Sequence, residues 1–133
     1  MSWHLNDDQL KLQAQARELA QQVIAPRAAE VDEAQEYPWA NVEALRDAGF
    51  TGMTVPAEFG GPGRSFLDAV LVVEEMAKVC GVTGRIAVEC NMGAISAVMA
   101  YGTHEQKKLA ADLVLAGDKP AICITEPGAG SSA

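Results

Sequence analysis

Apolar residues recur along most of this chain at the three-to-four-residue spacing that is typical of amphipathic helices. In the first segment, Leu12, Ala16 and Leu19 would share one face of a helix. Asn6 can cap that helix, and Gln9, three residues later, completes a capping-box pattern. The sequence therefore predicts a helix that begins near Asn6.

Prolines, glycines and capping residues divide the rest of the chain into further helices. Pro26 would kink the first helix or start a second one, and Pro38 opens the next, which Gly49 ends. Ser65 and Thr103 stand where N-terminal caps belong. We expect helices after the first one over about 26–34, 38–48, 65–80, 82–100 and 103–116.

The segment 82–100 is nearly apolar all round, which is typical of a helix in the centre of a bundle. Its few polar residues are Arg85, Glu89 and Asn91. A cation in such a helix needs an anionic partner. Glu89, four residues after Arg85, is the partner that we favour. A carboxylate, sulfinate or phosphate group of a ligand is the alternative.

The last residues of the chain form its most informative motif. The run 121–125 is the only convincing strand, and it opens into the loop Gly128-Ala129-Gly130-Ser131-Ser132-Ala133. Such a loop can bring backbone N–H groups close to a flat or anionic ligand, although a plain turn explains it about equally well. A lone strand cannot satisfy its own backbone groups, so we expect it to join a sheet outside this sequence.

Composition and charge narrow the possible partners. The chain has 133 residues, about one domain, and a formal net charge of −8, which argues against nucleic acid or an anionic membrane surface as a partner. It contains neither a signal-peptide pattern nor an apolar run of about 18 residues. Its three cysteines lack metal-ligand spacing, and all three lie in apolar company. We expect buried thiols, no metal site and a cytoplasmic protein.

The order of these signals resembles the N-terminal part of the acyl-CoA dehydrogenase flavoproteins. The resemblance runs through the whole chain, and the final motif, 125–131, is its most specific part because its order and position match. That match removes a dinucleotide-binding fold from consideration. The other matching elements are 5–9, 17–20, 24–26, Pro38, 45–49, Gly52, Pro56, 60–61, 74–75, 101–102 and 105–107.

The resemblance implies an all-α fold class, an N-terminal helical bundle that ends in the first strand of a β-domain. The helical domain would span 1–118, and 119–133 would start the middle β-domain, with a C-terminal helical domain beyond. FAD would lie between the β-domain and the C-terminal helices and would be completed by a second subunit, so a complete enzyme would be a homo-oligomer.

The resemblance also assigns roles to individual residues. The cofactor-binding residues would be Ile122, Ile124, Thr125, Gly130 and Ser131, with the Thr125 hydroxyl at the edge of the flavin ring. The acyl-CoA thioester would contact Arg85, Glu89, Asn91 and Ser131. The implied reaction removes an α-proton and transfers the β-hydrogen as hydride to flavin N5. The catalytic carboxylate belongs to the C-terminal domain, so no catalytic residue is expected in this chain.

A narrower resemblance links the chain to the 3-sulfinopropionyl-CoA desulfinases of the same superfamily, through 37–39, 74–78, 84–86 and 109–124. These enzymes keep the fold and FAD but release sulfite, and Arg85 would then hold the sulfinate. Ser132, where most relatives carry Asp, agrees with this alternative. The first interpretation remains acyl-CoA dehydrogenation. A helical interaction module without chemistry of its own is a third possibility.

Overall fold

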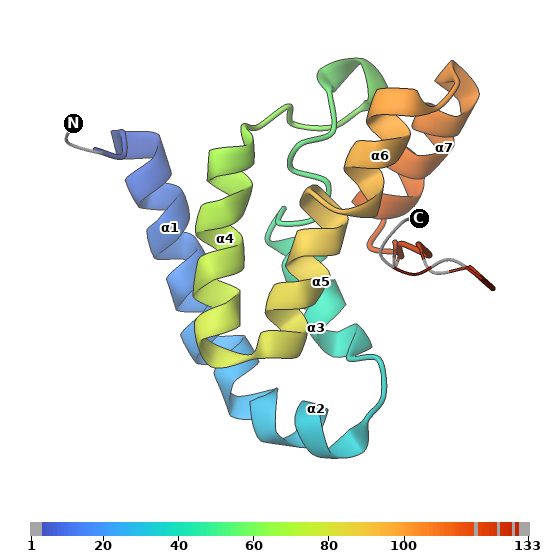
Figure 1. Ribbon diagram of the computed structural model, residues 1–133. Coiled ribbons are helices and arrows are strands. Elements are labelled where there is room, and N and C mark those ends of the chain that lie inside the picture. The colour runs from blue at the N-terminus through green and yellow to red at the C-terminus, as the bar shows by residue number, and fades with distance from the viewer. Residues whose placement is uncertain (1–3, 119, 125, 129, 131–133) are drawn as a thin grey trace.

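The computed structural model is a bundle of α-helices joined by turns and, between α3 and α4, by a long irregular segment (Figure 1). It describes residues 4–118, 120–124, 126–128 and 130. The α-helices are α1 (Asp7–Leu19), α2 (Ala28–Ala34), α3 (Trp39–Asp47), α4 (Phe66–Val79), α5 (Gly81–Asn91), α6 (Ala94–Tyr101) and α7 (His104–Leu115). A π-helical turn, Ala20–Ile24, and a 3-10 turn, Ala25–Arg27, join α1 to α2, and a second 3-10 turn spans Ala57–Phe59.

Three helices begin at complete capping boxes, as the sequence predicts. The Asn6 side chain accepts the backbone N–H of Gln9 at 2.8 Å, and the Gln9 side chain in turn accepts the N–H of Asn6 at 3.1 Å. The same reciprocal bonds start α4 and α7. Each box satisfies backbone donors that the first turn of a helix leaves without partners, so these helix starts are fixed locally.

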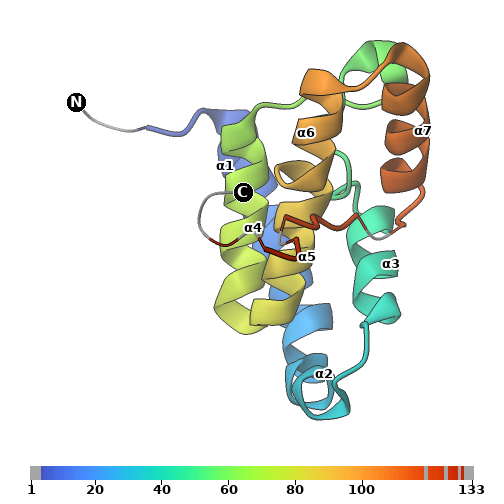
Figure 2. The ribbon, with the colours of Figure 1, turned by 45° about the vertical axis from the view of Figure 1, so that its right-hand side comes forward.

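Helices α1, α4 and α5 lie side by side and contain much of the core (Figures 1 and 2). Small residues let α4 and α5 approach closely: a Cβ atom at Gly84 would lie 2.7 Å from Cβ of Ala77. Ala16 and Ala87 are likewise fully buried. Close helix packing through alanine and glycine is consistent with a chain in which only 5% of the residues are aromatic.

The prediction of one helix over 82–100 is wrong, because Met92 and Gly93 interrupt it and separate α5 from α6. Gly81 is the first residue of α5. Helix α5 is central and mostly buried, whereas Ile95 is the only buried residue of α6. Helices α6 and α7 pack together at one end of the bundle (Figure 1).

The expected strand is also absent from the described residues. Residues 120–124 have no regular secondary structure, and Thr125 lies outside the part of the chain that the structure describes. No strand pairs with this segment among the described residues, which removes the hydrogen bonds that define a strand. Cys123 is exposed, which corrects the expectation of three buried thiols, whereas Cys80 and Cys90 are buried. No helix in the described ranges has the length and apolar character needed to cross a membrane.

A bidentate ion pair joins α1 to α4. Arg17 donates from Nε to Oε2 of Glu75 at 3.1 Å and from Nη2 to Oε1 at 2.9 Å. The Glu75 side chain is only 3% exposed, and Lys78 Nζ lies 3.0 Å from Oε1. The hydrogen bonds from Arg17 lower the pKa of the Glu75 carboxyl, against the opposing effect of burial. Glu75 is therefore held in its charged form between the two helices.

This ion pair should make the stability of the bundle sensitive to acid. Because the pKa of Glu75 is lower in the folded chain than in the unfolded one, its contribution is present above the unfolded value near 4.5. It is lost as the pH falls through the folded value. Glu75→Gln should lower the free energy of unfolding by about 2 kcal/mol at pH 7, and that deficit should shrink below pH ~4.

Urea unfolding between pH 3 and pH 7 measures this effect. Glu74→Gln is the matched control, because Glu74 pairs with the same Lys78 but its side chain is 51% exposed. A deficit for Glu75→Gln that stays constant across this pH range would contradict the account.

Candidate functional site

An ion pair on α5 is the first element of the candidate site. Arg85 Nη2 pairs with Glu89 Oε1 one helical turn later, so the partner favoured from the sequence is confirmed. The Glu89 side chain is 12% exposed and that of Arg85 is 69% exposed. A guanidinium has several N–H donors, and Glu89 engages only one end of it. The exposed donors of Arg85 can therefore bind an anion with two oxygens, in the manner of a carboxylate.

The Glu89 carboxylate also connects α5 to α6. Its Oε2 accepts the backbone N–H of Ala94, the first residue of α6, at 3.3 Å. Gly93 precedes α6 and has no side chain to cap it. Glu89 thus serves two groups at once, the guanidinium of Arg85 and the N-terminus of the next helix.

Asn91 is fully buried at the C-terminal end of α5. Its Nδ2 donates to the carbonyls of Phe50 and Ala87, each at 2.9 Å, and its Oδ1 accepts the N–H of Met53 at 2.7 Å. The amide therefore holds the chain segment after α3 against α5. Sequence reasoning singled out Asn91 as a polar residue in an apolar helix but missed this structural role. Its contact with a substrate stays a prediction.

Cys90 lies between Glu89 and Asn91 and is completely buried. Burial raises the pKa of its thiol to about 11, and the neighbouring Glu89 charge adds to the effect. The thiol is therefore protonated near neutral pH and contributes to packing rather than to nucleophilic chemistry.

The segment after α7 holds the predicted cofactor residues. It crosses in front of α5 in Figure 2. Ile122 and Ile124 have exposed apolar side chains, and a Cβ atom at Gly130 would meet no other atom within 4 Å. Exposed apolar groups and open glycine backbone fit a flat aromatic ring such as a flavin. Thr125 and Ser131 lie outside the described residues, so their predicted contacts stay predictions.

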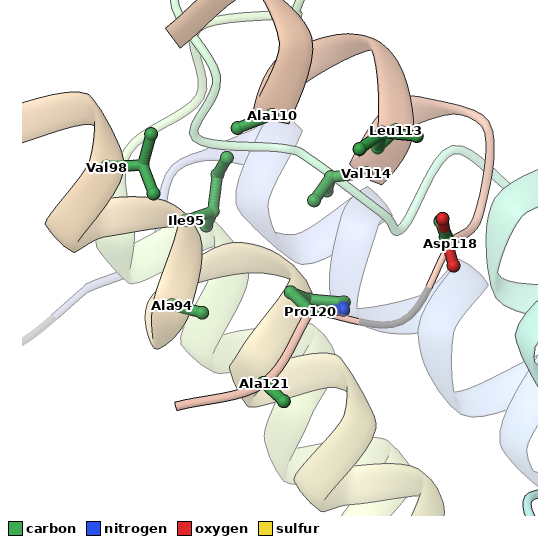
Figure 3. Close-up of a pocket in the computed structure, with 9 residues that line it drawn as sticks. All are labelled: Ala94, Ile95, Val98, Ala110, Leu113, Val114, Asp118, Pro120 and Ala121. Carbon is green, nitrogen blue, oxygen red and sulfur yellow. The ribbon is translucent and has the colours of Figure 1, made fainter. Parts of the chain in front are cut away.

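A small apolar cavity of about 220 Å³ lies between α6, α7 and the segment that follows α7. Figure 3 shows Ile95 and Val98 of α6 facing Ala110 and Val114 of α7, with Pro120 and Ala121 alongside. Ala94 lines the cavity and also donates its N–H to Glu89. Ala94 thus connects the Arg85–Glu89 pair to the apolar cavity.

Residues 6–118 match the sequence family described as "Acyl-CoA dehydrogenase, N-terminal domain". The chain belongs to the acyl-CoA dehydrogenase family. The match covers the seven α-helices of the described residues, and the predicted resemblance to this family is confirmed. The predicted boundary between a helical domain and a β-domain at 118 and 119 stays a prediction.

The relatives of this acyl-CoA dehydrogenase domain include desulfinases and dehydrogenases. The chain is 67% identical over 98% of its length to 3-sulfinopropanoyl-CoA desulfinase from Variovorax paradoxus, of which it covers 33%. It is 36% identical, over 98% of its length, to a probable medium-chain specific acyl-CoA dehydrogenase from Caenorhabditis briggsae, of which it covers 32%. The chain thus spans about a third of the length of these curated relatives.

Solved structures agree with the helical fold. The acyl-CoA dehydrogenase from Geobacillus kaustophilus superimposes with a TM-score of 0.86 at 25% identity, over 98% of this chain and 34% of that one. Butyryl-CoA dehydrogenase from Megasphaera elsdenii gives a TM-score of 0.81 at 27% identity, over 99% of this chain and 36% of that one. The predicted all-α fold of the acyl-CoA dehydrogenase type is therefore confirmed.

Proposed function

We propose that this chain is the helical N-terminal portion of an FAD-containing enzyme that releases sulfite from a sulfinate-bearing acyl-CoA thioester. The observation that carries the proposal is the Arg85–Glu89 pair, an exposed guanidinium held by a nearly buried carboxylate on a mostly buried helix. The 67% identity to a desulfinase supports the same substrate class. Family membership alone is equally compatible with dehydrogenation.

Arg85 would bind the sulfinate through its exposed N–H donors. A sulfinate presents two oxygens with the spacing of a carboxylate, and a guanidinium can donate to both. In the overall reaction, a hydrogen from water takes the place of the sulfinate group on carbon. The C–S bond breaks, a C–H bond forms, and sulfur leaves with the hydroxyl group of water as hydrogen sulfite. This reaction needs no external electron acceptor, because carbon gains the electron pair of the C–S bond.

The segment after α7 would contribute to the FAD site. Ile122 and Ile124 would lie against the flavin ring, Gly130 would allow its close approach, and the hydroxyls of Thr125 and Ser131 would bind its edge or the CoA portion. FAD, when bound, supplies a planar redox-active ring beside the acyl thioester. The support for this assignment is the exposure of the two isoleucines and the open space at Gly130. The complete enzyme would be a homo-oligomer, as the family resemblance implies.

Dehydrogenation of an acyl-CoA thioester at the α and β carbons is the second candidate function. The observations in its favour are the 36% identity to a probable medium-chain dehydrogenase and the apolar cavity between α6 and α7, which has room for part of an uncharged acyl chain. In that reaction FAD would accept the hydride, so turnover would require an external electron acceptor.

A substrate panel on the complete protein separates the two functions. We expect 3-sulfinopropionyl-CoA to yield one sulfite and one propionyl-CoA per turnover without any acceptor dye. Butyryl-CoA and octanoyl-CoA, assayed with an acceptor dye, should give at most slow dye reduction. Rapid dye reduction with an uncharged thioester, together with no sulfite from the sulfinate thioester, would replace this proposal by the dehydrogenase.

A further inference from the structure

The turn between α5 and α6 brings Gly93 against the side chain that holds Arg85. A Cβ atom at Gly93 would lie 2.8 Å from Cδ of Glu89 and 3.1 Å from its Cα, and closer still to Oε2. Approaches below about 3 Å are far inside van der Waals contact and force an atom to move. Any side chain at position 93 would therefore displace the Glu89 carboxylate or the turn itself.

The Glu89 carboxylate is fixed from two other directions. Oε2 accepts the backbone N–H of Ala94 at the start of α6, where the partial positive charge of the helix N-terminus favours an anion. Oε1 faces Arg85. The carboxylate therefore lies between the α6 backbone and the guanidinium, and it can do so because Gly93 has no side chain.

Arg85 needs such a fixed partner. Its side chain is 69% exposed and carries many rotamers, so placing its guanidinium for a ligand has an entropic cost. An ion pair with a fixed carboxylate reduces that cost before the ligand arrives.

We propose that Gly93 is a positioning residue for anion recognition, because it leaves room for the Glu89 carboxylate that orients Arg85. This inference rests on the proposed function, in which Arg85 binds a sulfinate. It adds a residue that touches no ligand but sets the preference for a charged acyl group over an uncharged one.

The test compares Gly93→Ala with Gly81→Ala in the complete FAD-loaded enzyme. Gly81 is the matched control, because it lies at the other end of α5 and a Cβ atom there would meet nothing within 4 Å. The KM for 3-sulfinopropionyl-CoA is measured from sulfite release, and the inhibition constant of propionyl-CoA from its competition in the same assay. The ratio of the two constants is the preference for the sulfinate. We expect Gly93→Ala to lower the preference for the sulfinate about tenfold, with propionyl-CoA binding and flavin content close to those of the wild type and of Gly81→Ala.

A second variant keeps the inference testable if Gly93→Ala fails to fold. Ala94→Pro removes the N–H that holds Glu89 Oε2, and proline is well accepted at the first position of a helix. It should also lower the preference for the sulfinate thioester.

The outcomes separate this inference from the proposed function. If Gly93→Ala folds and keeps the wild-type preference, the positioning role alone is overturned. If Gly93→Ala does not fold, a wild-type preference in Ala94→Pro overturns it. A wild-type enzyme that releases sulfite but shows no preference for the sulfinate thioester also overturns only the positioning role. A wild-type enzyme that releases no sulfite overturns the proposed function, and the positioning role with it.

Discussion

Replacing Arg85 by alanine in the complete protein should lower kcat/KM for sulfite release by about two to three orders of magnitude. The change removes the exposed donors and leaves the Glu89 carboxylate, which is only 12% exposed, without its cationic partner. That carboxylate would then repel the incoming sulfinate. Steady-state kinetics with 3-sulfinopropionyl-CoA, scored by sulfite production, measure the loss.

Two further variants show whether the effect belongs to the geometry of the site. Arg64→Ala removes an exposed arginine outside α5 and should leave kcat/KM unchanged. Arg85→Lys keeps the charge but loses the planar fork, so its rate should fall between those of the wild type and Arg85→Ala. Equal rates for the wild type and Arg85→Ala would exclude Arg85 from sulfinate binding.

Replacing Asn91 by alanine should give the largest loss of stability among single polar substitutions in α5. The variant leaves the N–H of Met53 and the carbonyl of Phe50 without their buried partner. Each orphaned group costs about 1–3 kcal/mol, so we expect a loss of about 3 kcal/mol or more and a fall in Tm of roughly 10 °C. Urea and thermal unfolding measure both quantities.

Asn6→Ala provides the comparison for this prediction. Asn6 caps α1 in an exposed position, so its loss should cost only about 1 kcal/mol. If Asn91→Ala destabilises the chain no more than Asn6→Ala does, the buried hydrogen bonds of Asn91 are not the anchor that the structure indicates.

The helix starts could be predicted from the sequence because each depends on residues three positions apart. Asn6 with Gln9 is such a pair, and the local bonds that it predicts are present. The break between α5 and α6 could not be predicted in this way, because it depends on a carboxylate that caps the next helix and on the close approach of Gly93. The apolar pattern of 82–100 continues across this break without interruption.

The strand over 121–125 was expected from its apolar residues, but a strand requires partners that lie elsewhere in a fold. Residues 121–124 have no such pairing within the described ranges and are irregular. The pattern therefore indicates what this segment can form once a sheet is supplied, whereas the structure shows the segment without one.

In the candidate site, too, the contacts between neighbouring residues could be predicted and those with distant residues could not. The Arg85–Glu89 pair has the i, i+4 spacing that brings side chains together on a helix, so it was predictable. Two partners of Asn91, Phe50 and Met53, lie about forty positions earlier in the chain, and no local pattern connects them to it. The flavin contacts of Thr125 and Ser131 stay predictions that rest on the family resemblance.

A crystal structure of the complete protein with a bound sulfinate thioester is the sharpest test of Arg85 as the sulfinate-binding residue. We expect sulfinate oxygens within hydrogen-bond distance of the Arg85 guanidinium, about 2.7–3.2 Å, with Glu89 on the opposite side of that group. A sulfinate bound by other residues, with Arg85 turned away into solvent, would contradict it.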